Sequence, residues 1–378
     1  MDALILSCGT GGGHDAAGRA IAEELSCRGH RVAMLNPYTL HSTALAERIN
    51  RVYITMAQKA PELFGLVYHA GQLYRKLPFR SPVYFANGAM VPVLQAYLEH
   101  HHTDVILMPH VFPAEILTNM KQRGLEIPAT IFVATDYVCI PFTEETDCDA
   151  YVIPSEALAE DFTNRGIPAE KLYPLGIPTS CSFRTGESKA AARERLGLEP
   201  DRPYVLVTGG SMGGGKIARV IDFLLSCAKE LPQIDFLLIC GSNERLAQQL
   251  RRMQLPNVTV LGYTNEMAGY MRAADLLITK PGGLSSTEAA VSGIPMVQTA
   301  AIPGCETTNA AFFSQHGMSL ACAASKKDLR KAMELLGDLP RQEAMLEQQK
   351  RWIAPDAAVK ICELAEQMGA SREKDTFG

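Results

Sequence analysis

Two stretches of the chain repeat one pattern: LILSCGTGGGH (Leu4–His14) and VLVTGGSMGGGK (Val205–Lys216). Each is an apolar run, then a glycine-rich loop, then a segment of helical periodicity that reaches Leu25 in the first case and Leu225 in the second. A strand, a glycine loop and a helix in this order begin a Rossmann-like βαβ unit. Because each half of the chain opens in this way, the sequence predicts two similar α/β domains.

Further apolar runs alternate with helical segments in both halves. They are apolar throughout, as strands of a parallel sheet buried on both faces are, so we predict two doubly wound parallel sheets. The predicted strands are Ala3–Cys8, Arg31–Leu35, Asp104–Met108, Thr130–Ala134, Tyr151–Ile153, Tyr204–Val207, Phe236–Cys240, Val258–Leu261, Leu276–Thr279 and Met296–Thr299.

The segment LGIPTS (Leu175–Ser180) has turn residues and no periodicity, so we place the interdomain linker there. The expected domains are residues 1–178 and 179–378, with C-terminal helices that can pack back toward the first domain. Two such domains enclose an interdomain cleft at the carboxyl ends of their strands, where open α/β sheets bind ligands.

Composition narrows the class of protein. The net charge of −5 over 378 residues argues against a dedicated nucleic-acid-binding protein. The ten cysteines form no CxxC pair and have no histidine cluster beside them, which suits a reducing compartment and gives no sign of zinc. The N-terminus lacks a signal-peptide pattern, and no apolar run approaches the ~20 residues of a membrane span. We therefore expect a cytoplasmic protein.

The second glycine loop exposes backbone N–H groups at a helix start, which is an anion site suited to phosphate. Gly210–Lys216 fits GxxxxGK, but Ile217 stands where a P-loop ATPase needs Ser or Thr for magnesium. A dinucleotide site needs an acid at the end of the second strand, where Asn36 and Cys240 stand instead. A tight packing turn remains an alternative for this loop.

A third element, KPGGLSSTE (Lys280–Glu288), follows an apolar strand and opens a helix. Its glycines Gly282 and Gly283 and its hydroxyls offer more phosphate donors. Glu288 lies inside the helix, where its carboxylate can accept both hydroxyls of a ribose; its alternative role is a favourable charge against the helix dipole. Two phosphate-competent loops and a ribose acceptor indicate a nucleoside diphosphate held without a metal.

These motifs resemble glycosyltransferase family 28, in its monogalactosyldiacylglycerol synthase and processive diacylglycerol glucosyltransferase branch. They run in family order across both halves. The matching segments are SCGTGGGH at Ser7–His14, VTGGSMGGGK at Val207–Lys216, GYTNEM at Gly262–Met267, ADLLITKPGGLSSTEA at Ala274–Ala289 and PGCETTNAAFF at Pro303–Phe313.

The resemblance implies a GT-B fold, an inverting mechanism and a UDP-sugar donor. With the two phosphate-competent loops, we expect no cofactor and no metal. The resemblance also implies that the diphosphate, the ribose, the uracil and the sugar are bound by the second half of the chain. The expected donor-binding residues are Gly210, Ser211, Met212, Gly213, Ser285 and Ser286 with Gly282 and Gly283 at the diphosphate, Glu288 at the ribose, Tyr263 through Met267 at the uracil, and Glu306 and Asn309 at the sugar. The branch usually has Gln where this chain has Cys305, so glucose and galactose both stay open.

Inverting transfer needs a base that takes a proton from the acceptor hydroxyl. His14 ends the first glycine loop, after Gly12 and Gly13, and an imidazole exchanges protons near neutral pH. Asp136 follows the strand TIFVAT and can orient His14 or serve as the base itself. The alternatives are a structural histidine on the first helix and a turn-forming aspartate. Asp147-Cys-Asp149 spells DxD, which we interpret as a turn and not as a metal site.

Basic and aromatic residues gather between Arg48 and Leu98, which contains six Lys or Arg residues and one acid, Glu62. Such a composition suits an anionic membrane surface. The expected membrane or acceptor residues are Arg75, Lys76, Phe79 and Arg80, together with Gly12 and Gly13; the aromatic residues of the stretch also include Tyr84 and Phe85. A helical insertion packed on its own domain is the alternative.

The sequence therefore predicts a peripheral enzyme on the cytoplasmic face of the cell membrane that moves glucose or galactose from a UDP-sugar to diacylglycerol, in one step or processively. Two other activities stay open. One is a peptidoglycan-type UDP-N-acetylglucosamine transferase with a lipid-linked acceptor, and the other is a UDP-N-acetylglucosamine 2-epimerase. A UDP-sugar-sensing binding protein is the non-enzymatic alternative.

Overall fold

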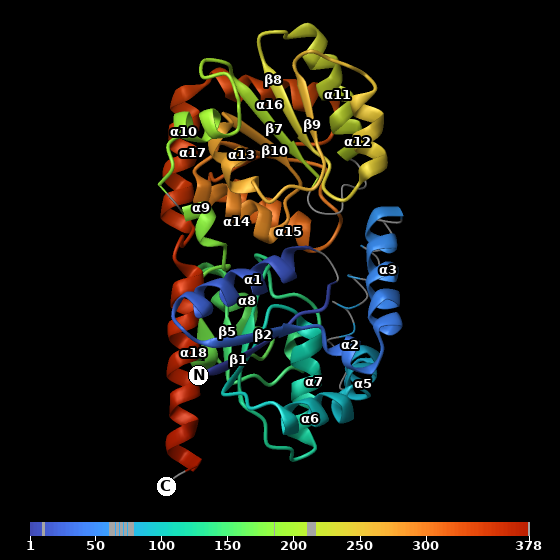
Figure 1. The fold of residues 1–378 in the computed structure, drawn as a ribbon, viewed down its shortest axis with the longest axis vertical. Coiled ribbons are helices and arrows are strands. Elements are labelled where there is room, and N and C mark those ends of the chain that lie inside the picture. The colour runs from blue at the N-terminus through green and yellow to red at the C-terminus, as the bar shows by residue number, and fades with distance from the viewer. Residues whose placement is uncertain are drawn as a thin grey trace. The chain divides into compact units, whose positions relative to one another are not determined.

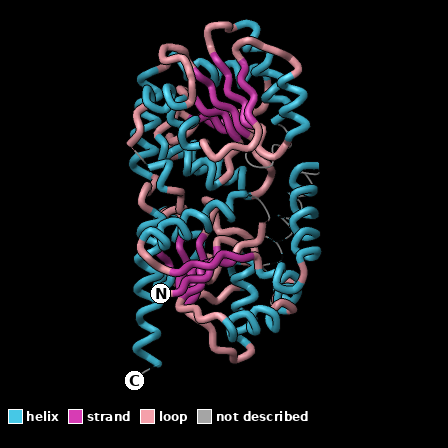
Figure 2. Tube along the Cα trace, viewed as in Figure 1, coloured by secondary structure: helices cyan, strands magenta, loops and turns pink. Residues whose placement is uncertain are grey.

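The computed structural model describes residues 1–9, 12–59, 65, 68, 71, 74, 79–184, 186–209 and 217–376. The chain forms two compact units. Unit 1 comprises residues 1–55, 63–181 and 354–378, and unit 2 comprises residues 56–62 and 182–353. Each unit contains one sheet with helices on its faces (Figures 1 and 2).

The sheet of unit 1 is six-stranded and has the order β2-β1-β3-β4-β5-β6. All of its neighbouring strands are parallel. The strands are β1 (Asp2–Leu6), β2 (Arg31–Leu35), β3 (Val105–Met108), β4 (Ala129–Val133), β5 (Ala150–Val152) and β6 (Leu172–Tyr173). The helices around them are α1 (Gly12–Cys27), α2 (Pro37–His41), α3 (Thr43–Lys59), α5 (Pro82–Gly88), α6 (Val91–His100), α7 (Val111–Gln122), α8 (Ala159–Thr163) and α18 (Ala357–Thr376).

Local sequence explains where several helices begin. Asn36 and Ser81 cap α2 and α5, each accepting a hydrogen bond from a first-turn amide, and each is followed by proline, whose fixed φ suits the first helical position. The linker glycine Gly176 has φ +97°, and a Cβ there would lie 3.1 Å from the Cβ of Ala357. Glycine thus lets the linker backbone approach the start of α18 closely.

One face of the unit 1 sheet is covered by the end of the chain. Ile361, Cys362 and Ala365 of α18 are fully buried in one core cluster with strand residues such as Ile5 and Ile131. In Figure 1, α18 lies against α1 and the strands of this sheet. Residues far apart in the sequence therefore complete a single core.

The sheet of unit 2 is also six-stranded and parallel, in the order β12-β11-β10-β7-β8-β9. Its strands are β7 (Tyr204–Thr208), β8 (Asp235–Ile239), β9 (Val258–Leu261), β10 (Leu276–Thr279), β11 (Met296–Gln298) and β12 (Leu320–Ala321). The helices are α9 (Cys181–Arg184), which begins at the unit boundary, α10 (Lys189–Arg195), α11 (Ile217–Glu230), α12 (Glu244–Arg251), α13 (Met267–Ala273), α14 (Gly283–Ser292), α15 (Cys305–Gln315), α16 (Lys326–Met333) and α17 (Leu339–Trp352).

Both predicted parallel sheets are confirmed, and each of the ten predicted strands lies on an observed strand. The expectation that all of them are buried on both faces is wrong for β2 and β9. These are edge strands, and every residue of β2 is at least partly exposed. The sequence analysis missed β6 and β12, edge strands of two residues each that are too short to show a pattern.

Candidate active site

The loops after three adjacent strands of unit 1 meet at the carboxyl edge of its sheet. Because β1 and β4 flank β3, the residues that follow these strands come close together. The first loop leads to His14 in the first turn of α1, the second carries Pro109 and His110, and the third carries Thr135 and Asp136. The structure thus brings the predicted catalytic segments to one edge.

His14 is half-buried, and its ring is held through Nδ1. This nitrogen lies 2.8 Å from the carbonyl oxygen of Pro109 and 2.8 Å from Oγ1 of Thr135. The ring also meets the ring of His110 edge to face, with centroids 4.6 Å apart. His14 is therefore anchored to the loops after β3 and β4.

His110 fixes the loop that presents the Pro109 carbonyl. Its Nδ1 accepts a hydrogen bond from the Phe112 amide at 3.1 Å and so caps α7. Burial lowers the pKa of His110 well below its usual value, and the neighbouring His14 lowers it further. His110 is therefore a neutral imidazole, and it adds no charge beside His14.

Asp136 is half-buried beside Thr135 at the same edge and remains a candidate base. The sequence analysis also gave Asp136 the role of orienting His14. The contacts on Nδ1 come from Pro109 and Thr135, which were given no role from sequence and which hold this side of the ring, and the orienting role of Asp136 stays a prediction. The signal that could have found them is their position directly after the strands β3 and β4.

A buried polar group lies behind this edge. Glu115 of α7 is fully buried and accepts a hydrogen bond from Asn87, whose side chain also accepts one from the hydroxyl of Tyr38. Burial raises the pKa of Glu115 to about 8. Burial likewise raises the pKa of the Cys8 thiol, so this cysteine at the end of β1 stays protonated.

In unit 2, the predicted phosphate-binding element lies at the start of α14, directly after β10. Gly282 is the N-cap in an extended conformation, Gly283 is the first helical residue, and Ser285 is half-buried. Glu288 is half-buried on the second turn of this helix. The second glycine loop, with Gly210, Ser211, Met212 and Gly213, lies outside the described residues.

Two residues of this region face the core. Ser286 is fully buried, and its Oγ accepts a hydrogen bond from Nε2 of Gln298 at 2.7 Å. Asn309 is fully buried, and its Nδ2 donates to the carbonyl oxygen of Pro281 at 3.0 Å. Both side chains thus support the loop from beneath, and the contacts expected of Ser286 with the diphosphate and of Asn309 with the sugar stay predictions.

Glu306 lies in the first turn of α15 and is mostly buried. Its carboxylate is 3.2 Å from Nζ of Lys280 and accepts a hydrogen bond from the Ile302 amide at 2.7 Å. Lys280, which was given no role from sequence, thus ties the end of β10 to the start of α15. The expected uracil segment is open to solvent at Tyr263, whose exposed fraction is 72%, and Met267 begins α13.

The predicted membrane residues fall into three groups. Phe79 is exposed, as is the nearby Phe85. Arg80 instead packs on its own unit, since its guanidinium donates to the carbonyl oxygen of Glu145 and lies over the ring of Tyr84, which is buried. Arg75 and Lys76 lie outside the described residues. Among the described helices, none is long and apolar enough to cross a membrane.

The DxD carboxylates are engaged by lysines. Asp147 pairs with Lys171 at 2.9 Å and Asp149 with Lys121 at 2.7 Å. Although burial opposes it, the hydrogen bonds from Lys121 and Thr130 lower the pKa of Asp149. Both carboxylates therefore act as structural anchors before β5.

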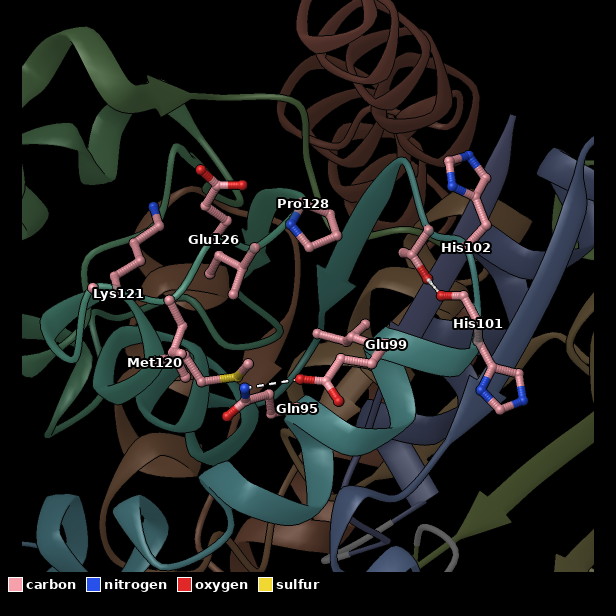
Figure 3. A pocket seen from close by; sticks show the side chains of 13 residues that line it. Gln95, Glu99, His101, His102, Met120, Lys121, Glu126 and Pro128 are labelled. Carbon is pink, nitrogen blue, oxygen red and sulfur yellow. Dashed lines mark hydrogen bonds between the residues drawn. The ribbon is translucent and has the colours of Figure 1, made fainter. Parts of the chain in front are cut away.

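One hollow of unit 1 is at the other edge of its sheet. It has a volume of about 1060 Å³ and is lined by residues that precede β3 and β4, such as Thr103 and Pro128, and by the ends of α6 and α7. Figure 3 shows the side chains that line it, among them Gln95, which donates a hydrogen bond to Glu99 of the same helix. Ligands of open α/β sheets bind at the carboxyl edge, which is the edge that carries His14 and not the edge with this hollow.

Comparison with known proteins identifies the family. The profile of monogalactosyldiacylglycerol (MGDG) synthase matches residues 14–179, and that of the glycosyltransferase family 28 C-terminal domain matches residues 204–361. The chain belongs to glycosyltransferase family 28. In this glycosyltransferase, the residues that match MGDG synthase lie mostly in unit 1. Those that match the family 28 C-terminal domain lie mostly in unit 2, and both matches agree with the resemblance.

Individual relatives agree with the family. The chain is 24% identical over 352 residues to a processive diacylglycerol beta-glucosyltransferase of Bacillus pumilus, covering 92% of this chain and 90% of the relative. It is 30% identical over 268 residues to the enzyme of that name from Staphylococcus saprophyticus, covering 68% and 66%. The crystal structure of MurG from Acinetobacter baumannii superposes with a TM-score of 0.63 at 18% identity, covering 97% of this glycosyltransferase and 99% of MurG. The GT-B prediction is therefore confirmed.

Proposed function

We propose that this chain transfers a hexose from a UDP-sugar to the hydroxyl group of diacylglycerol with inversion, forming a membrane glycolipid. The family and the names of the relatives support the reaction class. The observation that carries the proposal is His14, held through Nδ1 by the loops after β3 and β4 in the unit that matches the MGDG synthase profile.

In this proposal, the residues of unit 1 move the proton. His14 takes it from the acceptor hydroxyl as that oxygen bonds to the anomeric carbon of the sugar, and the bond from the sugar to UDP breaks with its electron pair on the diphosphate. Asp136 at the same edge is the second candidate for the base.

The residues of unit 2 hold the donor. The N-terminus of α14, with Gly282, Gly283 and the hydroxyl of Ser285, presents donors to the diphosphate and stabilises its developing charge without a metal. Glu288 accepts the ribose hydroxyls, Tyr263 through Met267 face the uracil, and Glu306 contacts the sugar. The glycine loop with Gly210, Ser211, Met212 and Gly213 completes the diphosphate site. Glucose and galactose are both allowed by these residues.

The membrane supplies the acceptor. We propose that the protein docks on the cytoplasmic face of an anionic membrane through the basic and aromatic stretch between Arg48 and Phe85. Support comes from Arg48, Arg51 and Val52, which are exposed on α3, and from the exposed rings of Phe79 and Phe85. Such residues combine electrostatic attraction with insertion of apolar groups at a bilayer surface.

The test is direct. The protein is incubated with labelled UDP-glucose or UDP-galactose and vesicles that contain diacylglycerol, and the labelled lipid is identified by mass spectrometry. We expect a hexosyl diacylglycerol, and turnover about 10²–10⁴-fold lower for His14→Ala, because a general base is lost. His41→Ala, at an exposed position on α2, is the matched control.

Each other outcome has a clear meaning. No label in any lipid would refute the proposed transfer. A fall in turnover for Asp136→Ala much larger than that for His14→Ala would move the base to Asp136. Loss of activity with a chelator would refute metal-free stabilisation of the diphosphate.

A further inference from the structure

We propose that Thr135 is a positioning residue that keeps the proton of neutral His14 on Nδ1, so that Nε2 is the atom that accepts the proton of the acceptor hydroxyl. The inference rests on the proposed function and adds to it the tautomer of the base and the side chain that selects it. It stands on the geometry of three loops in unit 1.

Pro109 provides the first hydrogen-bond acceptor for Nδ1 of His14. Its carbonyl oxygen can only accept a hydrogen bond, and it lies 2.8 Å from Nδ1 of His14. At that distance two lone pairs would repel each other, so Nδ1 carries the hydrogen. In a neutral imidazole the other nitrogen, Nε2, is then the unprotonated one, and it is the only ring atom that can act as a base.

Thr135 provides the second acceptor for the same nitrogen. Its Oγ1 lies 2.8 Å from the same Nδ1, and the residue is only 8% exposed. A hydroxyl oxygen can accept, so the Nδ1 hydrogen is shared between Thr135 and Pro109. Two acceptors that converge on one hydrogen disfavour the other tautomer and restrict rotation of the ring.

Both acceptors are held in place by the sheet of unit 1. Pro109 directly follows β3 and Thr135 comes two residues after the end of β4, and these neighbouring strands are paired through Met108 and Phe132. The Pro109 loop is fixed further because the next residue, His110, caps α7. The two acceptors are thus set by the sheet, and the side chain of Thr135 is the one of them that substitution can remove.

The same two contacts act when His14 takes the proton of the acceptor hydroxyl. When Nε2 takes the proton, the acceptor O–H bond breaks, an Nε2–H bond forms, and the ring becomes a cation. Thr135 and Pro109 then stabilise that cation, because hydrogen bonds to a charged donor are stronger than those to a neutral one. Other titratable groups of this edge are His110 against the ring, Asp15 on α1, Cys8 after β1, Glu115 on α7 and Asp136 beside Thr135.

The experiment reads the tautomer and the rate separately. In protein labelled with ¹⁵N-histidine, the ring nitrogen shifts of His14, assigned with His14→Gln, distinguish Nδ1–H from Nε2–H without any substrate. The pH profile of glycolipid synthesis is then measured for the wild type, Thr135→Val and Thr135→Ser. Thr118→Val, a buried threonine of α7 whose hydroxyl donates to the Ala114 carbonyl, is the matched control.

We expect the Nδ1–H tautomer in the wild type and in Thr135→Ser. In Thr135→Val we expect a mixture, because the ring has lost one of its two acceptors and can rotate away from the Pro109 carbonyl. We also expect kcat about 3–10-fold lower for Thr135→Val with an unchanged KM for the UDP-sugar, and an acidic limb about half a pH unit lower, because a hydrogen bond to the cation is lost. Thr118→Val should leave the limb where it is.

An Nε2–H tautomer in wild-type His14 would overturn the inference, as would a Thr135→Val variant with an unchanged tautomer and pH profile. If the tautomers behave as expected but no glycolipid forms, the proposed function fails and the positioning role of Thr135 does not. If Thr135→Val does not fold, an Nε2–H tautomer in the wild type or in Thr135→Ser would still overturn the inference.

Discussion

Glu115 is a buried residue of unit 1 whose protonation differs between the folded and the unfolded chain. Its carboxyl group is fully buried, and within the described part of the chain its Oε1 has no hydrogen-bond partner. A charged carboxylate is costly in such a place, which is why burial raises the pKa of Glu115 to about 8. The folded protein therefore keeps this group protonated at neutral pH, whereas the unfolded chain does not.

This difference predicts a pH dependence of stability. The folded state binds one more proton than the unfolded state between a pH of about 4.5 and about 8, so the free energy of unfolding falls as pH rises through that window, by on the order of 5 kcal/mol in the limit. Glu115→Gln keeps the side chain neutral and should remove this fall. Denaturant unfolding of both proteins at pH 5 and pH 8 measures it. Equal pH dependence in the two proteins would contradict the raised pKa.

Glu288 is the residue on which the nucleotide assignment depends. We expect Glu288→Ala to weaken UDP binding by about 1.5–3 kcal/mol, because hydrogen bonds from the ribose to a carboxylate are lost. Calorimetric titration with UDP measures the effect, with Glu343→Ala, an exposed glutamate of α17, as the control. Unchanged affinity would place the ribose elsewhere, and equal thermal stabilisation by UDP and ADP would refute the uridine assignment.

At the scale of an element, α15 depends on the glycine that precedes it. Gly304 is the N-cap and has φ 120° and ψ −131°, a combination that residues with a Cβ rarely adopt. This turn places Glu306 against Lys280 and the Ile302 amide, and it puts Asn309 under the Pro281 carbonyl. The start of α15 therefore sets the loop that leads into α14.

We expect Gly304→Ala to destabilise unit 2 by about 1–3 kcal/mol through backbone strain, and to weaken UDP binding as the loop shifts. Gly337→Ala is the matched control, because Gly337 lacks a positive φ and a Cβ there would meet no atom within 4 Å. Thermal unfolding and UDP titration of the two variants are compared. Similar behaviour of both variants would show that the turn tolerates a side chain.

The sequence predicted the strands of the two sheets better than the side-chain contacts of the candidate site. Apolar runs such as Val258–Leu261 are recognisable because both the strand and its flanking turns have characteristic residues. The carboxyl-edge rule also predicted that His14 and Asp136 follow strands that end at the same edge of the sheet, and these strands, β1 and β4, flank β3. It did not reveal Thr135 and Pro109 as partners of His14, nor the inward side chains of Ser286 and Asn309, because which side chains face the core is decided by packing between distant segments.

At the scale of the whole molecule, charge is unevenly distributed. The net charge is −5, yet the stretch from Arg48 to Leu98 has six basic residues and one acid. Its described part exposes Arg48 and Arg51 on α3 and the rings of Phe79 and Phe85, while Arg80 is held by Glu145 and Tyr84. A test of membrane docking should therefore use the exposed residues and leave Arg80 intact.

We expect the protein to bind anionic vesicles, to bind neutral ones weakly, and to dissociate as salt is raised, because exposed charges are screened beyond about 10 Å at 0.1 M salt. Combined Arg48→Glu and Arg51→Glu should weaken binding by roughly 10-fold or more, at about 1 kcal/mol per basic residue. Arg341→Glu with Arg351→Glu on α17 makes the same change in net charge as a control. Vesicle sedimentation measures binding, and equal binding by both double variants would contradict docking through α3.

The position of α18 has a consequence for biosynthesis. This helix covers one face of the sheet of unit 1, yet it is translated only after all of residues 182–353. At about 5–20 residues per second, the ribosome needs on the order of ten seconds or more for that interval. Throughout it, Ile5, Leu107 and Ile131 lack the cover that Ile361 and Ala365 later provide. The core on this face of unit 1 therefore stays incomplete while unit 2 is synthesised, and chaperones can bind the exposed apolar surface during that time.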